Sequence, residues 1–298
     1  MWSAWTGLAP RRALRSTPTV LNETQRATYH RDGYLILRGF VASDAIAVLR
    51  ARAEAIVAAF DPADASVFTT TDQDRHIDRW FLDSGDAVRC FLEVGAVDPA
   101  GQLTRDKRLA VNKIGHALHD RDPVFDAFSR TAALAELASD LGLSAPLIWQ
   151  SQYIFKQPGI GGEVRWHQDA TFFVTEPVTV TTFWFALEEA TVANGCLWAE
   201  PGGHRGPLRE RFVRDGDATR TEPVDPAAWP TTATAVPLEA AAGDLVVFGG
   251  LLPHYSATNT STASRHAYTL HVTDAAAVYA PTNWLQRRTD DPARGFRP

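Results

Sequence analysis

Residues 178–190, VTVTTFWFALEEA, form a run in which β-branched and aromatic side chains dominate. This composition and length are typical of a β-strand. Comparable runs lie at 147–157, LIWQSQYIFKQ, at 244–250, DLVVFGG, and at 265–275, RHAYTLHVTDA, and a shorter one, GYLILRGF, lies at 33–40. Gly, Pro and Asn separate the later runs, and no helical pattern between them is long enough to connect parallel strands. The second half of the chain therefore predicts an antiparallel barrel or jelly roll.

Helical periodicity is found in the first half of the chain. Between Ser43 and Phe60, apolar residues recur at spacings of three and four, behind a serine that can cap the first turn. A second helical region runs from Asp122, a candidate cap, to Leu141, with a candidate break near Ser129. We therefore expect a mainly β fold with flanking helices packed outside the β core.

Composition favours a small-molecule partner. The chain of 298 residues is 45% hydrophobic, and 29 basic and 35 acidic residues give a net charge of -6. These charges are spread along the chain, so we expect no nucleic-acid surface. No apolar run approaches the roughly 18 residues that a membrane span requires. Oligomeric state cannot be read from these features.

Cysteine usage points to a reducing compartment. Only Cys90 and Cys196 are present, far apart in the sequence, which argues against a disulfide framework or a structural zinc site. We therefore expect a cytoplasmic protein. Residues 1–21 contain arginines and no acid, so import into an organelle is the alternative, although we expect a disordered tail there.

The remaining residues, 22–298, are expected to form a single domain. Within it, residues 202–239 are rich in Arg, Asp, Pro and Thr and lack clear periodicity. A loop this long in a compact domain is usually functional or mobile. We expect a candidate lid over the barrel mouth, and a surface insertion is the alternative.

Two metal-capable side chains, His167 and Asp169, stand one residue apart in the stretch GGEVRWHQDATFF (161–173). In a strand they would project from the same face, with Gln168 facing away. His254, in FGGLLPHYSATN, can supply a third ligand. Two histidines and one carboxylate on a β scaffold are the facial triad of non-haem Fe(II) oxygenases.

Arg265 strengthens this interpretation, because it follows His254 by eleven positions and begins a predicted strand. Its planar fork can bind a carboxylate through two hydrogen bonds, and Ser256 can add a hydroxyl. Together they would hold the distal carboxylate of a 2-oxo diacid whose keto acid end chelates iron.

WHQD (166–169), the later histidine with Ser256 two residues on, and Arg265 eleven residues after that histidine resemble the phytanoyl-CoA dioxygenase family of Fe(II)/2-oxoglutarate oxygenases. GYLILRGF, NGCLWAEPGGH and GDLVVF also match that family, so the resemblance runs from about Asn22 to Leu285. NKIGHALHDRDPVF, QSQYIFKQP and NWLQ are similar to a narrower group, the phytanoyl-CoA dioxygenase domain-containing protein 1 group.

The resemblance implies a double-stranded β-helix of the jelly-roll, cupin-like type. It also implies that the protein binds Fe(II) and 2-oxoglutarate and uses dioxygen as a substrate. Members of the group usually have Met at the position of Gln152 and often Pro at the position of Trp166. We expect the difference at Trp166 to reshape the substrate side of the site. The implied residues are His167, Asp169 and His254 for Fe(II), and Arg265, Ser256, Lys113, Gln152 and Trp184 for 2-oxoglutarate.

Four other histidines could bind a metal or could serve only in packing and hydrogen bonding. His116 and His119 are a candidate metal pair, but roles beside the site or at the surface are preferred. His266 and His271 lie on opposite faces of the last strand by parity, and packing or hydrogen bonding suffices for them.

Polar residues of the candidate lid are further candidates. His204 and Arg205 are either substrate contacts or a turn pair. The stretch GHRGPLRERFVR (203–214) leads to the hypothesis that Arg209, Arg211 and Arg214 meet a polar or anionic substrate.

We expect an oxygenase that hydroxylates a small or medium organic substrate with release of succinate and carbon dioxide. The family name suggests an acyl-CoA, but a family does not fix a substrate. Asp169 disfavours halogenation, which needs a small residue at that position. A jelly-roll binding protein without turnover and a zinc hydrolase are the alternatives, and the hydrolase leaves Arg265 and Ser256 unexplained.

Overall fold

A seven-stranded antiparallel sheet, the major sheet, forms one layer of the structure, a computed structural model that describes residues 19–68 and 78–296. Its strands overlap all five of the runs that predicted strands. In spatial order they are β1 (Tyr34–Leu37), β12 (Leu245–Gly249), β7 (Thr181–Ala186), β14 (Ala267–Asp274), β4 (Pro146–Ile154), β3 (Val111–His116) and β2 (Val88–Leu92).

A four-stranded antiparallel sheet, the minor sheet, packs against the inner face of the major sheet. One buried cluster joins Trp184 and Phe248 of the major sheet to Leu197 and Leu238 of the minor sheet. Two antiparallel sheets packed face to face form the double-stranded β-helix, a jelly roll, that the sequence predicted. The minor strands, in order, are β11 (Val236–Leu238), β8 (Leu197–Ala199), β13 (His254–Ser256) and β5 (Val164–His167).

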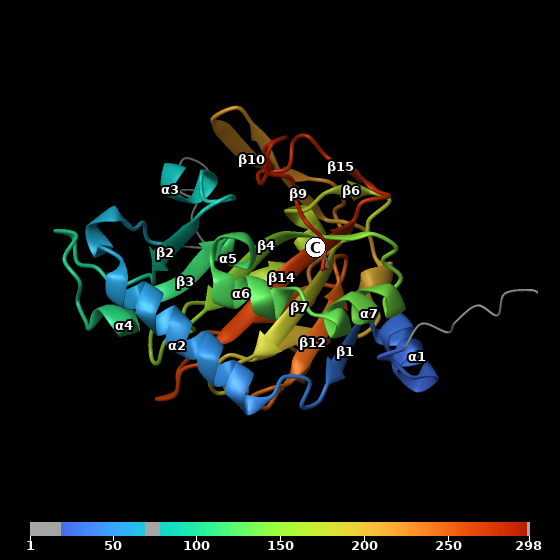
Figure 1. The fold of residues 1–298 in the computed structure, drawn as a ribbon, viewed down its shortest axis with the longest axis horizontal. Coiled ribbons are helices and arrows are strands. Elements are labelled where there is room, and N and C mark those ends of the chain that lie inside the picture. The colour runs from blue at the N-terminus through green and yellow to red at the C-terminus, as the bar shows by residue number, and fades with distance from the viewer. Residues whose placement is uncertain (1–18, 69–77, 297–298) are drawn as a thin grey trace, which may run out of the picture.

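Helices cover the outer face of the major sheet. Figure 1 shows α2, α6 and α7 in front of the strands. The main buried cluster contains Phe183 and Leu270 of the sheet together with Leu49 of α2, Phe125 of α6 and Leu137 of α7. The helices are α1 (Glu23–Asp32), α2 (Ser43–Ala59), α3 (Arg79–Leu82), α4 (Lys107–Ala110), α5 (Leu118–Arg121), α6 (Pro123–Ser129) and α7 (Ala132–Asp140), with a 3-10 turn, η1, at Pro62–Asp64.

Most described helices begin at a capping side chain, but α2 and α5 do not. Asp122 caps α6 by accepting hydrogen bonds from the backbone N–H groups of Val124 and Phe125, as the sequence predicted. The predicted break after Ser129 is also present, because α7 begins only at Ala132. Ser43 does not cap α2. Ala42 occupies that position, and no side chain caps the helix.

The candidate lid at 202–239 contains regular structure, so the expectation of an irregular loop is wrong. A 3-10 turn, η4 (Gly203–Arg205), is followed by an antiparallel hairpin of β9 (Glu210–Asp215) and β10 (Ala218–Pro223), and then by β11. Two neighbouring residues of β9, Phe212 and Val213, are both buried. Because this pattern departs from strict alternation, the strand gave no periodic signal.

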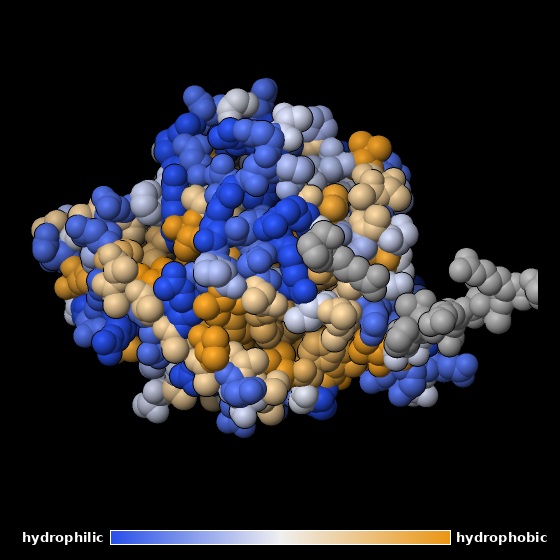
Figure 2. Space-filling view, viewed as in Figure 1, coloured by the Kyte–Doolittle hydropathy of each residue, from blue (hydrophilic) through white to orange (hydrophobic). Residues whose placement is uncertain are grey.

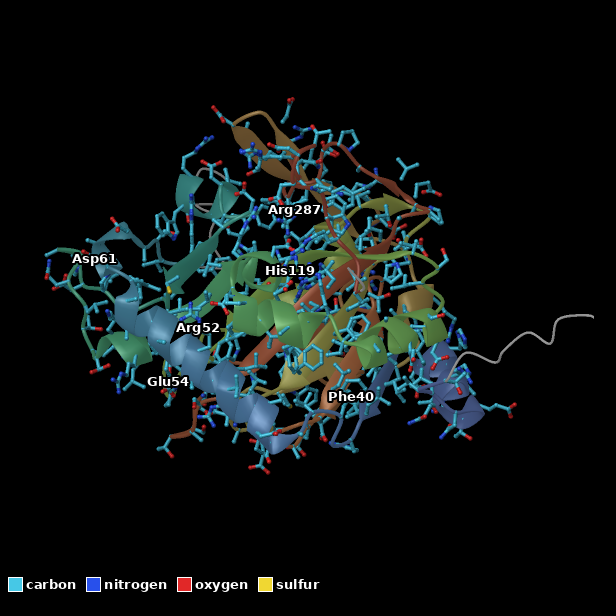
Figure 3. The ribbon with its side chains drawn as sticks, viewed as in Figure 1. Phe40, Arg52, Glu54, Asp61, His119 and Arg287 are labelled. Carbon is cyan, nitrogen blue, oxygen red and sulfur yellow. The ribbon has the colours of Figure 1, made fainter. Side chains whose placement is uncertain are left out.

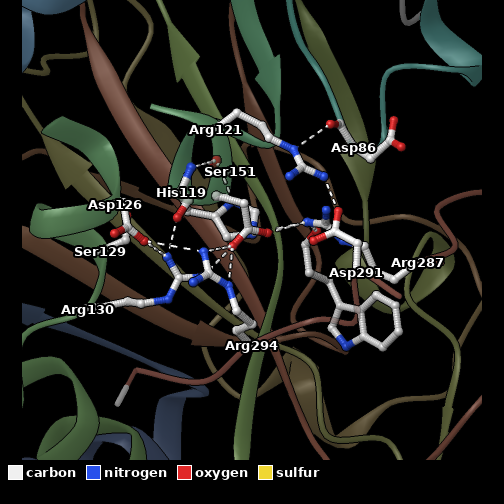
Figure 4. A network of polar contacts seen from close by, with 12 residues as sticks. Asp86, His119, Arg121, Asp126, Ser129, Arg130, Ser151, Arg287, Asp291 and Arg294 are labelled. Atoms are coloured by element: carbon white, nitrogen blue, oxygen red, sulfur yellow. Dashed lines mark hydrogen bonds and ion pairs between the residues drawn. The ribbon is translucent and has the colours of Figure 1, made fainter. Parts of the chain in front are cut away.

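A buried network of charges attaches the C-terminal segment to α5 and α6 (Figure 4). Figure 3 labels His119 and Arg287, which lie close together above the sheet. Asp120 pairs with Arg130 at 2.6 Å, with Arg294 at 2.7 Å and with Arg287 at 3.1 Å. Figure 2 shows hydrophilic residues gathered over this part of the face, and apolar ones below it.

The N-terminal segment is fixed to α7 where the described residues begin. A tail was expected at residues 1–21, and residues 1–18 of it lie outside the described part of the chain. The backbone N–H groups of Val20 and Leu21 donate to the carboxylate of Asp140. The short strands β6 (Thr175–Glu176) and β15 (Val278–Tyr279) pair near the C-terminus. Every helix in the described part of the chain is too short or too polar to cross a bilayer.

Candidate active site

His167, Asp169 and His254 converge at one end of the jelly roll. One ligand atom from each lies within 4.8 Å of those of the other two. The Nε2 atoms of His167 and His254 lie 3.6 Å and 3.7 Å from Oδ1 of Asp169. Two imidazoles and a carboxylate oxygen around one point could hold a divalent metal ion.

Strand pairing brings the two histidines together. His254 of β13 lies directly opposite His167 of β5, and their ring centroids are 4.0 Å apart. Nδ1 of His167 donates to the carbonyl oxygen of Arg165 at 2.8 Å, and Nδ1 of His254 to that of Leu252 at 3.0 Å. A carbonyl oxygen only accepts, so each Nδ1 carries the proton and each Nε2 lone pair is left for a metal.

Asp169 reaches the site from a turn, so the prediction that it shares a strand face with His167 is wrong. Strand β5 ends at His167, and Asp169 opens a 3-10 turn, η3 (Asp169–Thr171). The turn is held because the N–H of Phe172 donates to the carbonyl oxygen of Asp169 and that of Ala170 donates to Gly250.

Gln168, which separates the two ligands in the sequence, is held in the protein interior. It is fully buried, and its amide N–H group donates to the carbonyl oxygens of Pro207 and Leu251 at 2.9 Å and 2.8 Å. Its Oε1 accepts from the backbone N–H of Arg209 at 2.9 Å. Gln168 therefore ties the two ligands beside it to the segment that precedes the β9/β10 hairpin.

The second carboxylate oxygen of Asp169 is held from the major sheet. Thr182 Oγ1 donates to Oδ2, and Nε2 of His271 lies 3.6 Å from the same atom. Burial alone would raise the pKa of Asp169, but His254 and His271 outweigh it and hold the pKa well below its usual range. Burial, followed by the charge of His254, lowers the pKa of His167 to about 3, which keeps this imidazole neutral.

His271 was missed by sequence reasoning, which assigned it ordinary packing. A signal was present in its spacing. His271 lies six positions after Arg265, an even number, so both residues are expected on the same face of the strand.

Arg265 forms a buried cationic pocket at the other side of the site. Its side chain is 2% exposed, and its Nη2 donates to Oγ of Ser256 at 3.4 Å. Its Cζ lies 5.3 Å from the ring centroid of Trp184. Within the described residues its Nε and Nη1 have no hydrogen-bond partner, and neither does Oγ1 of Thr269.

An unpaired guanidinium in such a place needs an anion. Burial lowers the pKa of Arg265 to about 10, so the group remains charged at neutral pH. A buried charge without a partner is strongly unfavourable, and a planar guanidinium with unused N–H groups matches a carboxylate. The residues present therefore fit a dicarboxylic ligand beside the metal ligands.

Residues 29–267 match the family model described as Phytanoyl-CoA dioxygenase (PhyH). The chain belongs to the phytanoyl-CoA dioxygenase family. It is 43% identical over 269 residues to Phytanoyl-CoA dioxygenase 1 of Oryza sativa subsp. japonica, covering 90% of this chain and 95% of the relative. It is 40% identical over 284 residues to Phytanoyl-CoA dioxygenase domain-containing protein 1 of Rattus norvegicus, covering 91% and 97%.

The fold agrees with this membership. The crystal structure of EctD from S. alaskensis with 2-oxoglutarate and 5-hydroxyectoine is similar with a TM-score of 0.61 and 22% identity, over 95% of this chain and 87% of that one. Family, triad and anion pocket together identify this chain as an Fe(II)- and 2-oxoglutarate-dependent dioxygenase.

Two further family positions lie on neighbouring strands of the major sheet. Lys113 of β3 is buried, and its Nζ lies 3.2 Å from the ring centroid of Phe68. Gln152 of β4 donates its amide N–H to Oε1 of Gln150 at 2.6 Å. The contacts of Lys113 and Gln152 with 2-oxoglutarate, which the family resemblance implies, stay predictions.

Trp166 faces away from the metal ligands. Neighbouring residues of a strand point to opposite faces, so Trp166 lies on the other side of the minor sheet from His167. There its ring stacks on Tyr255, with centroids 5.3 Å apart and planes at 19°. We therefore no longer expect Trp166 itself to shape the substrate side.

His116 and His119 do not form a metal pair. Nδ1 of His116 lies 2.6 Å from Oγ of Ser84, whereas Nδ1 of His119 lies 2.8 Å from Oγ of Ser151. Both imidazoles are fully buried, so a surface role is wrong as well.

The candidate lid residues have separate surroundings. Arg205 donates to the carbonyl oxygen of Arg31 at 2.6 Å, which places η4, with His204, against the end of α1. In the hairpin region, Arg209 is buried with its Cζ 5.0 Å from the Trp229 ring centroid. Arg211 and Arg214 were also expected to meet the substrate. Arg211 is exposed, and Arg214 donates to the carbonyl oxygen of Leu82 at 2.6 Å.

Proposed function

We propose that this dioxygenase hydroxylates a small or medium organic substrate and releases succinate and carbon dioxide. The observation that carries the proposal is the pairing of two features within one site: the His167, Asp169 and His254 triad, and Arg265 with two unpartnered donor atoms. Neither a simple binding barrel nor a zinc hydrolase needs both.

The side chains divide the work between two ends of the site. His167, Asp169 and His254 would hold Fe(II), which with bound 2-oxoglutarate supplies the activation of dioxygen for oxidation of a C–H bond. Arg265 would take the distal carboxylate of 2-oxoglutarate through Nη1, which has no partner, and the second N–H of Nη2, with Ser256 fixing the orientation of the guanidinium.

The ligand arrangement favours oxygenation over halogenation. Asp169 supplies a carboxylate oxygen toward both histidines, so its place is not left open for a halide. Thr182 and His271 hold the other oxygen, which keeps the carboxylate from rotating away.

The test is anaerobic addition of Fe(II) and then 2-oxoglutarate to the apoprotein, followed by visible absorption. A metal-to-ligand charge-transfer band should form in the wild type. It should be lost in Asp169→Ala and Arg265→Ala, and it should persist in Arg220→Ala, which removes an exposed arginine of β10. Release of succinate over a panel of substrates then tests turnover.

Two outcomes would contradict the proposal. No band, with zinc retained after purification, would favour the hydrolase. A band without succinate release over a broad panel would favour a binding protein that has kept the cofactor site.

A further inference from the structure

An aromatic wall extends from the metal ligands toward β2 and α3. We define it as one apolar cluster that contains Phe81, Phe91, Phe172, Phe212 and Trp284. Phe172 lies beside the site, because its ring centroid is 6.3 Å from that of His167. Phe212 of the β9/β10 hairpin is 5.6 Å from Phe172, so the candidate lid contributes to the wall.

His116 lies at the far end of the aromatic wall. Its ring centroid is 5.5 Å from that of Phe81, 5.4 Å from that of Phe91 and 5.3 Å from that of Trp284. Trp284 also lines a surface cleft of about 330 Å³. The imidazole is therefore enclosed by flat apolar groups, one of which borders solvent-accessible space.

The hydrogen bonds of Ser84 determine which nitrogen of His116 carries the proton. Oγ of Ser84 lies 2.5 Å from the carbonyl oxygen of Phe81 and 2.6 Å from Nδ1 of His116. The carbonyl can only accept, so the one hydroxyl proton of Ser84 is used there. Ser84 must then accept from an Nδ1–H group, and Nε2 of His116 is left as a lone-pair acceptor.

That acceptor has no partner. Nε2 of His116 is buried without a hydrogen bond to any described residue. Burial, followed by the charge of Lys113, lowers the pKa of His116 well below its usual value, so the imidazole stays neutral and Nε2 stays unprotonated. An unsatisfied buried acceptor is unfavourable by roughly 1–3 kcal/mol and calls for a donor.

His271 has a second unpartnered ring nitrogen, beside the metal ligands. Its Nε2 lies 3.6 Å from Oδ2 of Asp169. Its Nδ1 is buried and has no partner within the described residues. The ring of Phe173 stacks on it, with centroids 4.9 Å apart and planes at 17°.

His116 and His271 lie on strands of the major sheet that are two positions apart. His116 ends β3 and His271 lies on β14, and only β4 stands between these strands. Two strand spacings place their backbones roughly 10 Å apart. A ring-sized body between them would lie against the aromatic wall and close to the metal ligands.

We propose that His116 and His271 are substrate-binding residues, and that the primary substrate carries hydroxyl or N–H donors on a compact apolar body. The inference rests on the proposed function, because it describes the substrate side of that same site. It narrows the substrate class from any organic molecule to alcohols, phenols, amines or amides of ring size.

The first test uses two matched pairs of probes, phenol with anisole and cyclohexanol with methoxycyclohexane. Each methyl ether keeps the shape of its partner and lacks the donor. Long-range ¹H–¹⁵N spectra of histidine-labelled apoprotein should show His116 protonated at Nδ1. Phenol or cyclohexanol should shift its Nε2 resonance upfield, and the ethers should not.

Two substitutions of His116 separate substrate binding from a structural role. His116→Asn keeps an N–H group at the position of Nδ1 for Ser84 and removes the Nε2 acceptor. His116→Gln keeps an acceptor near Nε2 and loses the bond to Ser84. Phenol affinity should fall about tenfold in His116→Asn and stay within about threefold in His116→Gln. A purely structural role predicts the reverse order.

Several results would overturn the inference: a protonated Nε2 in the wild type, equal binding of phenol and anisole, or no binding of any probe. The spectra of the wild type decide the first two even where a variant does not fold. Since these measurements need no iron, they are independent of the charge-transfer band. A band together with equal binding of alcohols and ethers would remove this inference and leave the proposed function standing.

Discussion

Oγ of Ser256 donates a hydrogen bond to the carbonyl oxygen of Gly195 at 2.9 Å, and this bond sets the role of Ser256 toward Arg265. Because the single hydroxyl proton is committed to Gly195, Oγ can only accept from Nη2 of Arg265. The loop before β8 thus orients the guanidinium that we assign to 2-oxoglutarate.

Gly195→Ala should weaken 2-oxoglutarate binding. Gly195 has φ of +82°, and an added Cβ would lie 2.6 Å from the carbonyl oxygen of Ala257 and 2.7 Å from Cε of Lys156. The strain should lower the unfolding free energy by about 1–3 kcal/mol and displace Ser256. Titration of the charge-transfer band should give a higher dissociation constant for 2-oxoglutarate.

Gly216→Ala is the matched control for this prediction. Gly216 also has a positive φ, +61°, but a Cβ there would meet nothing within 4 Å. It should lower stability modestly and leave 2-oxoglutarate affinity unchanged. Equal affinities for the two alanine variants would contradict the link between Gly195 and the anion pocket.

Thr182→Val should weaken metal binding. The substitution keeps the shape of the side chain and removes the hydroxyl that donates to Oδ2 of Asp169. Loss of a partner that orients a metal ligand typically lowers affinity by about 10–100-fold. Calorimetric titration with Co(II) measures the change.

Thr181→Val serves as its control, since Oγ1 of Thr181 donates to the carbonyl oxygen of Thr179 instead. Its metal affinity should remain that of the wild type. An unchanged affinity in Thr182→Val would mean that the carboxylate holds its orientation without this hydroxyl.

Asp120→Asn should destabilise the fold at neutral pH. The Asp120 side chain is 3% exposed and pairs with Arg130, Arg287 and Arg294. Removing the acid leaves the buried guanidinium of Arg287 without its counter-charge, whereas Arg130 and Arg294 keep Asp126. Loss of one partner of a buried ion pair typically lowers the unfolding free energy by about 3–5 kcal/mol. Chemical denaturation at pH 7 measures the difference.

The difference in unfolding free energy between the wild type and Asp120→Asn should shrink in acid. Burial would raise the pKa of Asp120, but hydrogen bonding to His119 and the nearby arginines outweigh it and hold the pKa well below its ordinary value. Its contribution is therefore complete above the unfolded-state pKa of about 3.9 and is lost as the pH falls toward the folded value. A gap between wild type and Asp120→Asn that widened below pH 4 would contradict this assignment.

Trp166→Ala should lower stability without changing the cofactor site. Its ring stacks on Tyr255 outside the minor sheet, so truncation should lower the unfolding free energy by about 1–2 kcal/mol. The charge-transfer band should keep its position and its 2-oxoglutarate dependence. A shifted band would show that Trp166 acts on the ligands after all.

Local patterns in the sequence predicted much of this fold. Five of the seven strands of the major sheet were visible because alternation and β-branched residues are local properties, and the cap at Asp122 is set within four residues. Strands β2 and β3 were not predicted. The hairpin at 210–223 was missed, since Phe212 and Val213 are buried side by side and charged residues flank them. Ser43 looked like a cap but lies one position too late.

What the sequence determined by itself is the chemistry: two histidines, one aspartate and one arginine at spacings that suit a metal and a carboxylate. Tertiary structure decided how these groups are held, because hydrogen-bond partners come from strands far apart in the chain. Oδ2 of Asp169 meets Thr182 and His271 only after β7 and β14 pair. The free acceptor on His116 likewise depends on Ser84, 32 residues away, and so could not be read from local pattern.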